Sequence, residues 1–146
     1  MRVGLQTWGT EGDIRPFIAL SAELVRNGHF VSLSATEIMN GDYSCFGEKF
    51  GFQVSHPGHL NISREEFTAL GTRFVSSTNP VLKSRLLVEN FLNPCRDEMY
   101  EKALELCGNS DLVVGHLFAY PLRAAARKTG VPWVSLYTTP VIPSST

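Results

Sequence analysis

A carboxylate in the stretch Trp8 to Pro16 (WGTEGDIRP) could accept a proton from a bound ligand. Glycine, threonine and acidic residues gather here between an apolar hexamer, Arg2 to Thr7, and a segment with helical periodicity. Asp13 would lie at the start of that helix, where a carboxylate repels the phosphates that helix N-termini often bind. We therefore expect the turn to face an uncharged group and Asp13 to act as a general base toward it.

Asp13 also has a purely structural interpretation as the N-cap residue of the helix. An N-cap carboxylate accepts hydrogen bonds from free amides of the first turn and contributes about 1 kcal/mol. The two roles can coexist, although capping lowers the carboxyl pKa and weakens it as a base. The turn contains neither the GxGxxG spacing of dinucleotide-binding proteins nor the GK[ST] of a P-loop.

A histidine at the end of a later apolar strand, Asp111 to His116 (DLVVGH), is the expected partner of Asp13. Ligands of open parallel sheets bind outside the carboxyl ends of the strands. Three stretches leave such ends: Trp8 to Asp13, His116 to Tyr120, and Thr138 to Pro143. From the residues alone, a core histidine bonded to the backbone is the favoured interpretation of His116.

The elements that would position these residues alternate between strands and helices. Arg2 to Thr7 reads as a strand, Ile14 to Val25 carries an apolar stripe at helical spacing that ends at Asn27-Gly28, and Phe30 to Ala35 is a second strand. The further expected elements are a helix at Asp42 to Phe50, a strand at Phe52 to His56, an irregular stretch at His56 to Ser77, helices at Pro80 to Leu92 and Pro94 to Cys107, a strand at Asp111 to His116, a helix at Tyr120 to Thr129 and a strand at Trp133 to Tyr137. Parallel strands joined by right-handed crossovers predict an α/β, Rossmann-like sheet with helices on both faces.

Composition limits the classes of ligand. The 146 residues suit one domain, and 13 basic against 14 acidic side chains indicate neither nucleic acid nor a membrane as partner. No signal peptide and no apolar run of ~18 residues is present, so we expect a cytoplasmic protein without a transmembrane segment. Cys45, Cys95 and Cys107 lack CxxC spacing and are expected to be inert buried thiols, and His56 and His59 are too few for a metal site.

Two segments resemble a known enzyme family. GTEGDIRPFIALSAELVRNGHFVSL resembles the opening of the N-terminal domain of GT-B glycosyltransferases, in the group with sterol glucosyltransferases and antibiotic glycosyltransferases. That group's pattern G-[ST]-x-G-D-[VI]-x-P, followed by GH, is matched by Gly9, Thr10, Gly12, Asp13, Ile14, Pro16, Gly28 and His29. DLVVGHLFAYPLRAAARKTGVPWVSL resembles a later strand, helix and strand of the same domain.

The resemblance implies a two-domain enzyme in which residues 1–146 form the acceptor-binding domain. A C-terminal domain that binds the nucleotide sugar would lie outside this chain, which alone is expected to be inactive. The implied reaction moves a hexose from a UDP- or TDP-sugar to a hydroxyl of a lipophilic acceptor such as a sterol or natural product. It would invert the anomeric centre and use no metal, and no cofactor beyond the nucleotide sugar as co-substrate.

The resemblance also assigns roles to residues. Asp13 matches the family's general base, and His116 matches a position where plant-type relatives carry an aspartate that partners a histidine, so the pair would be exchanged here. The predicted catalytic residues are Asp13 and His116, and the predicted substrate contacts are Trp8, Thr10, Gly12, Phe118, Tyr120 and Thr138. The alternative is a stand-alone Rossmann-like or flavodoxin-like module that binds a small molecule without catalysis.

Overall fold

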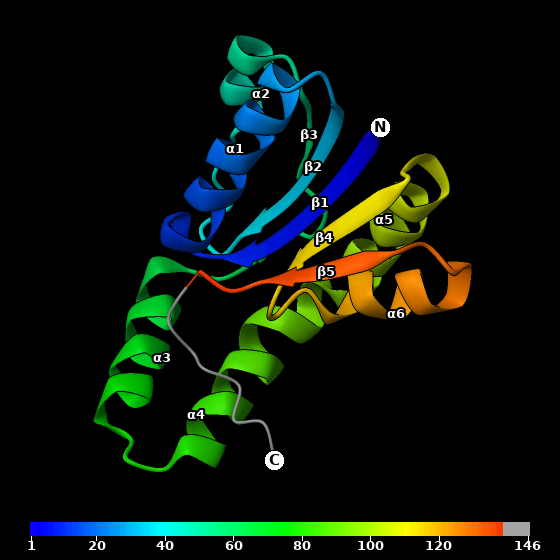
Figure 1. The fold of residues 1–146 in the computed structure, drawn as a ribbon. Coiled ribbons are helices and arrows are strands. Elements are labelled where there is room, and N and C mark those ends of the chain that lie inside the picture. The colour runs from blue at the N-terminus through cyan, green and yellow to red at the C-terminus, as the bar shows by residue number, and fades with distance from the viewer. Residues whose placement is uncertain (139–146) are drawn as a thin grey trace.

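Five parallel strands form one sheet in the computed structural model, which describes residues 1–138 (Figure 1). The strands are β1 (Arg2–Gly9), β2 (Phe30–Glu37), β3 (Gln53–Ser55), β4 (Leu112–His116) and β5 (Trp133–Leu136). Their order across the sheet is β3-β2-β1-β4-β5, with the first strand of the chain in the centre. The predicted Rossmann-like α/β class is therefore confirmed.

Helices cover both faces of this sheet. They are α1 (Glu11–Arg26), α2 (Ser44–Phe50), α3 (Arg64–Ser76), α4 (Pro80–Leu87), α5 (Arg96–Asn109) and α6 (Tyr120–Thr129). A π-helical turn η1 (Val88–Leu92) and a 3₁₀ turn η2 (Asn93–Cys95) connect α4 to α5. Figure 1 shows α1 and α2 on one side of the sheet and α5 and α6 on the other, while α3 and α4 extend away from it.

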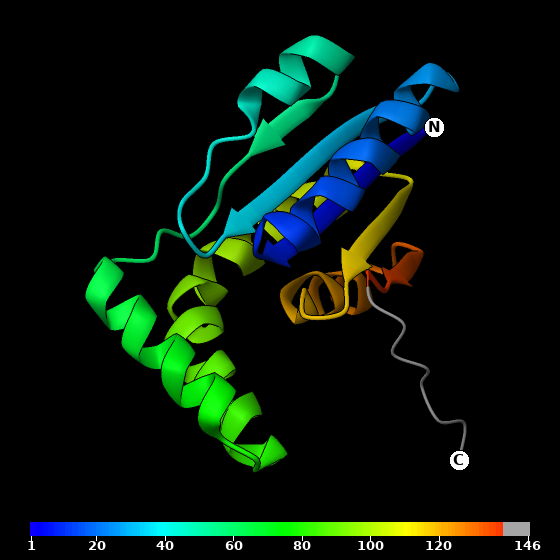
Figure 2. The same cartoon turned by 90° about the vertical axis from the view of Figure 1, so that its left-hand side faces the viewer.

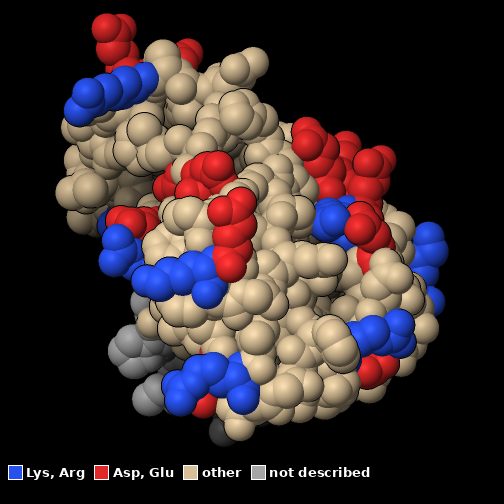
Figure 3. Space-filling view, turned by 90° about the horizontal axis from the view of Figure 1, so that it is seen from above, with Lys and Arg blue, Asp and Glu red and all other residues tan. Residues whose placement is uncertain are grey.

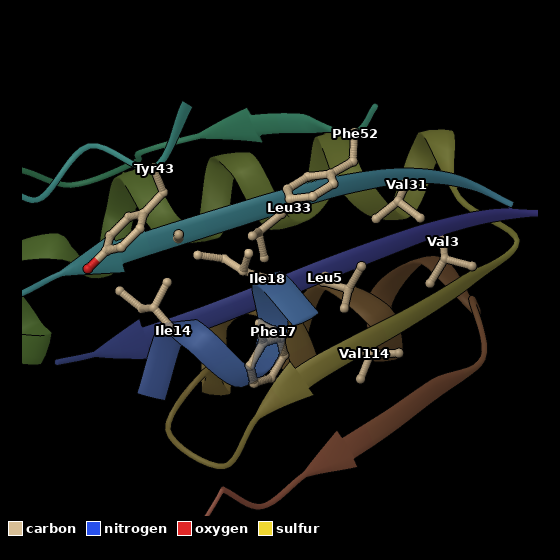
Figure 4. Packing of buried hydrophobic residues seen from close by; sticks show 11 residues of the cluster. Val3, Leu5, Ile14, Phe17, Ile18, Val31, Leu33, Tyr43, Phe52 and Val114 are labelled. Atoms are coloured by element: carbon tan, nitrogen blue, oxygen red, sulfur yellow. The ribbon is translucent and has the colours of Figure 1, made fainter. Parts of the chain in front are cut away.

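The larger core lies between α1 and the centre of the sheet. Ile14, Phe17 and Ile18 of α1 are buried against strand residues that include Leu5 and Leu33 (Figure 4). Burial of each such side chain stabilises the fold by about 1.5–3 kcal/mol. On the other face Ala125 and Ala126 of α6 are buried in a cluster with residues of α5 and β4, and their small size allows the close helix-to-sheet packing predicted from the alanine run. These two layers fix the carboxyl ends of β1 and β4 side by side.

The predicted turn after β1 is wrong in extent. The strand continues to Gly9 and α1 begins at Glu11, so one residue, Thr10, connects them instead of six. Trp8 therefore belongs to the strand. Burial of both faces of β1 overrides the turn-forming tendency of Trp8-Gly9, because the whole strand from Val3 to Gly9 is buried.

The predicted irregular stretch from His56 to Ser77 is also wrong, because it contains α3. This helix begins with a capping box, in which Ser63 Oγ accepts from the Glu66 amide and the Glu66 carboxylate accepts from the Ser63 amide. No residue of α3 is fully buried, so the sequence has no strong apolar stripe there. The spacing Ser63-x-x-Glu66 was the available local signal.

The cysteines, the length of the helices and the surface charges can be compared with the expectations from composition. Cys45 is exposed, which corrects the expectation that it is buried, while burial raises the pKa of the Cys95 thiol to about 11. Within residues 1–138, no helix is both long and apolar enough to cross a bilayer. Figure 3 shows both basic and acidic side chains on the face viewed from above, with several acidic side chains gathered at its upper right.

Candidate active site

The carboxyl ends of β1, β4 and β5 bring three polar side chains together. Asp13 follows β1 in the first turn of α1, His116 is the last residue of β4, and Thr138 lies two residues after β5. The parallel pairing of β1 with β4 and of β4 with β5 aligns these ends at one edge of the sheet. Residues far apart in the sequence thus form one cluster.

Asp13 is held by the residue that connects β1 to α1. Its Oδ2 accepts hydrogen bonds from the Thr10 amide at 2.9 Å and from Thr10 Oγ1 at 3.1 Å. Thr10 is the N-cap of α1, and Asp13 is the third helical residue, whose side chain bonds back to it. The interpretation of Asp13 as the N-cap is therefore wrong, although its carboxylate does stabilise the helix start.

Gly9 makes room for the Asp13 carboxylate. Its φ of 142° lies in a region that residues with a side chain rarely adopt, and a Cβ there would lie 2.3 Å from Asp13 Oδ2. The carboxylate thus packs directly over the Gly9 backbone. Gly9 belongs to the site although it was not among the predicted site residues, and its place at the strand end just before Thr10 was the available signal.

The second oxygen of Asp13 faces His116 and Thr138. Asp13 Oδ1 accepts a 3.4 Å hydrogen bond from Thr138 Oγ1 and lies 3.7 Å from His116 Nε2, which is beyond hydrogen-bond distance. His116 Nε2 is 3.1 Å from Thr138 Oγ1. The hydroxyl of Thr138 therefore links the two predicted catalytic residues, and the pair is not joined directly.

Burial separates the roles of the two residues. The His116 side chain is 4% exposed, whereas that of Asp13 is 28% exposed. Burial lowers the pKa of His116, and the nearby Asp13 carboxylate opposes this only in part. A neutral His116 that donates from Nε2 lets Thr138 accept from it and donate to Asp13, which satisfies both contacts. Of the two side chains, Asp13 is the more accessible to a ligand.

Aromatic rings surround the histidine. Phe118 lies 5.6 Å from His116 and 6.0 Å from Trp8 between ring centroids, and Phe17 lies 6.1 Å from His116 on the side of the core. Trp8 is 2% exposed, and its indole Nε1 has no hydrogen-bond partner among the described residues. Phe118, at 39% exposure, is thus the accessible apolar wall of the site.

The remaining predicted residues lie at the margins. Gly12 is exposed in the first turn of α1, and Thr10 is exposed beside Asp13. Tyr120 begins α6 and lines a separate small hollow of about 120 Å³ that also reaches His116. Of the predicted stretch Thr138 to Pro143, residues 139–143 lie outside the described part of the chain. The contact of each of these residues with a ligand stays a prediction.

Pocket volume alone would not locate the cluster of Asp13, His116 and Thr138. A pocket of about 970 Å³ lies near the amino ends of β1 and β2 and is lined by residues such as Arg2, Phe30 and Gln53. A second hollow of about 490 Å³ lies between α3 and the turns η1 and η2, and includes Leu60, Leu70 and Asn90. The cluster is identified instead by an accessible carboxylate held at the edge where parallel sheets bind ligands.

The chain is similar over nearly its whole length to curated enzymes. It is 25% identical over 139 residues to a sterol 3-beta-glucosyltransferase of Candida albicans, and 26% identical over 140 residues to one of Neurospora crassa. These matches cover 94% and 96% of this chain, which spans 8% of the length of each relative. No protein-family model matches the sequence.

Solved structures share the fold. The glycotransferase of kitacinnamycin matches with a TM-score of 0.65 at 15% identity, over 97% of this chain and 31% of its own. The glycosyltransferase SnogD from Streptomyces nogalater matches with a TM-score of 0.64 at 17% identity, over 96% of this chain and 34% of its own. A hydrogenase C-terminal domain from Pyrococcus furiosus also matches, with a TM-score of 0.58 at 12% identity, over 91% of this chain and 90% of its own.

Together these likenesses confirm the resemblance drawn from the sequence. Similarity to sterol glucosyltransferases and to the fold of antibiotic glycosyltransferases extends over 94% to 97% of this chain. The chain has the fold of one Rossmann-like half of a GT-B structure. The likeness to a hydrogenase domain indicates that this fold serves other proteins as well.

Proposed function

We propose that this chain is the acceptor-binding half of an inverting glycosyltransferase. It would bind a lipophilic alcohol, such as a sterol or natural product, while a second domain binds a UDP- or TDP-hexose. The observation that carries this proposal is the Asp13 carboxylate. It is accessible, held at the carboxyl edge of the sheet by Thr10 and Gly9, and lies in a chain similar to sterol 3-beta-glucosyltransferases.

In the proposed reaction, Asp13 Oδ1 takes the proton of the acceptor hydroxyl. The hydroxyl oxygen forms a bond to the anomeric carbon as the bond from that carbon to the nucleoside diphosphate breaks. Because attack and departure occur on opposite faces, one displacement inverts the anomeric centre. Positioned proton transfer of this kind contributes about 10²- to 10⁴-fold in rate. The charge on the leaving diphosphate would be stabilised by amides of the second domain, without a metal.

His116 and Thr138 would position the base and would not touch the acceptor. The buried imidazole fixes the Thr138 hydroxyl at 3.1 Å, and that hydroxyl holds Asp13 Oδ1 at 3.4 Å. Oδ2 is engaged by Thr10, so Oδ1 is the oxygen left to bond an incoming hydroxyl. This division of roles follows from the 4% exposure of the His116 side chain.

The apolar character of the surroundings supports a lipophilic acceptor. Leu117 and Phe118 follow the end of β4 and are each 39% exposed, and Tyr137, just before Thr138, is 40% exposed. Exposed apolar side chains beside a polar group are typical of sites that bind a mainly apolar ligand by one hydroxyl.

Binding experiments on the 146-residue chain test the division between the two halves. We expect calorimetry or tryptophan fluorescence to detect saturable binding of a sterol or a polycyclic natural product. UDP- and TDP-glucose should bind only weakly, because the described residues contain no phosphate-binding glycine motif. Micromolar binding of either nucleotide sugar by this chain alone would contradict the proposed division.

A non-catalytic binding module is the second candidate, because a hydrogenase domain shares the fold over 90% of its own length, so the fold occurs in a unit of this size. The two candidates make different predictions for the reading frame after Thr146 and for the role of Asp13. A catalytic half requires a second Rossmann-like domain encoded after Thr146 and an Asp13 that is needed for turnover. The second candidate would be favoured if an Asp13 variant bound the acceptor as well as the unchanged chain and the whole protein transferred no sugar.

A further inference from the structure

The hairpin of α3 and α4 ends in a tip that exposes apolar side chains. We define the tip as residues 73–85 (RFVSSTNPVLKSR), which include the last turn of α3, a short loop and the start of α4. Val75 and Val81 are 78% and 74% exposed, and Phe74 and Leu82 are 38% and 42% exposed. Figures 1 and 2 show the tip at the end of the hairpin that is farthest from the sheet.

Local contacts hold these side chains in the exposed position. Asn79 caps α4 by accepting from the amides of Val81 at 3.0 Å and of Leu82 at 3.3 Å. The ammonium of Lys83 lies 5.2 Å from the centre of the Phe74 ring, a cation-π contact that joins the two helices. The tip is thus structured without any core of its own. Its apolar surface needs another partner or stays in water.

The charge of the tip differs from that of the chain. Arg73, Lys83 and Arg85 lie within it and no acidic residue does, although the whole chain carries a net charge of −1. Arg85 is paired with Glu89 at 2.7 Å. Arg73 and Lys83 have no carboxylate within 4 Å among residues 1–138. Arg73 is exposed, and Lys83 is partly buried, so the tip carries two cations without an acidic partner.

Apolar and basic side chains on a protruding tip fit a lipid bilayer with anionic headgroups. Apolar side chains of such a segment enter the headgroup region, and each nearby Lys or Arg adds attraction to anionic lipid. A stable interface with a protein partner would have to bury about 800 Å² of surface on this side. A flat or concave surface supplies that area more readily than a narrow tip. The bilayer is therefore the occupant that these observations favour.

We propose that the α3–α4 tip docks on membranes that contain anionic phospholipid, with Val75 and Val81 in the headgroup region and Arg73 and Lys83 on the phosphates. The proposal goes beyond the proposed function and does not depend on it, because docking requires no sugar transfer. Because basic and acidic residues are nearly equal in number over the whole sequence, its net charge does not indicate the basic tip. Docking would place the carboxyl edge of the sheet toward a membrane, where lipophilic alcohols dissolve.

Vesicle sedimentation with the 146-residue chain tests the proposal. Vesicles of phosphatidylcholine with phosphatidylserine should bind the chain more tightly than vesicles of phosphatidylcholine alone. The pair Val75→Ser and Val81→Ser should weaken binding by about tenfold or more, because the lost methyl groups no longer leave water. The pair Arg73→Gln and Lys83→Gln should weaken binding to the anionic vesicles only, by roughly 25-fold, from about fivefold per cation.

Matched controls lie at the opposite end of the molecule. Phe30→Ser removes a side chain that is 77% exposed at the start of β2, and the pair Arg127→Gln and Lys128→Gln removes two cations from the last turn of α6. Both should leave vesicle binding unchanged, and circular dichroism should confirm that every variant is folded. If the Val75→Ser and Val81→Ser pair reduces folding, the Arg73→Gln and Lys83→Gln pair still tests the proposal.

Several results would overturn the proposal. Absence of binding to anionic vesicles would do so, and so would an equal loss of binding in the control variants. Concentration-dependent self-association that Val75→Ser abolishes, without vesicle binding, would instead assign the tip to a contact between copies of the chain. Failure of docking would leave the proposed function intact, because acceptor binding and turnover are measured without vesicles.

Discussion

Replacing Asp13 with asparagine separates its role as a base from its role at the start of α1. The amide oxygen of asparagine can still accept the 2.9 Å hydrogen bond from the Thr10 amide. The change removes one negative charge near a helix N-terminus. A negative charge there stabilises a helix by about 0.3–1 kcal/mol. We therefore expect the free energy of unfolding to fall by less than about 1 kcal/mol.

Turnover should fall much further. An amide cannot take the proton of the acceptor hydroxyl, so the loss should be about 10²-fold or more, which corresponds to at least about 2.7 kcal/mol in the barrier. The assay is the steady-state rate of sugar transfer by the product of the full reading frame, at saturating donor and acceptor. Thermal or urea unfolding of the same variant supplies the stability comparison.

Glu11→Gln is the matched control. Glu11 lies in the same turn of α1, is exposed, and pairs with Arg15, so its loss should leave turnover unchanged. His116→Ala should slow transfer as well, and its effect should be far from additive with that of Asp13→Asn because the two act through Thr138 as one unit. Near-normal turnover in a folded Asp13→Asn protein would refute the assignment of the base.

Three further predictions concern other parts of the account. Gly9→Ala should lower the free energy of unfolding by more than about 1 kcal/mol and reduce transfer, since its Cβ would lie 2.3 Å from Asp13 Oδ2; unchanged urea unfolding would show that the site adapts. Burial lowers the pKa of His116 in the folded chain below its ordinary value of 6.5, so the unfolded chain binds the proton more readily and stability is lost as pH falls through that range. His116→Gln should flatten the fall in unfolding free energy between about pH 7 and pH 5, and an unchanged slope would assign it to other groups. Amides of α3, which has no fully buried residue, should exchange hydrogen faster than those of α1; equal protection of the two helices would mean that the hairpin opens only with the whole fold.

The sequence was sufficient for the architecture because its strongest signals are periodic. The apolar stripe and the glycine after it predicted α1 and its C-terminal end, although the helix begins three residues before Ile14, and the alanine-rich stretch predicted α6 to both ends. The end of β1 was missed because turn propensity at Trp8-Gly9 yields to burial on both faces of a central strand, which only the tertiary structure decides. In α3, Phe67 and Leu70 pack against a core cluster but no residue is fully buried, so the periodic signal is weak and the cap at Ser63 was the clearer one.

The site was predictable in its members but not in its connections. Asp13 and His116 could be placed at one edge from the order of strands, because parallel strands end together. That Thr138 lies between them, and that His116 is buried while Asp13 is not, depends on side-chain packing across β4 and β5. The role of Gly9 likewise depends on a backbone angle that the sequence does not determine.

Transfer of a sugar to a lipophilic alcohol is the most direct test of the central claim. The product of the full reading frame should be incubated with UDP- and TDP-glucose and a panel of sterols and polycyclic natural products, and the products analysed by mass spectrometry and NMR. The account predicts an alcohol that gains one hexose with inverted anomeric configuration, in an amount that depends on Asp13. A folded protein that binds these alcohols but transfers hexose to none of them, or that retains the anomeric configuration, would contradict it.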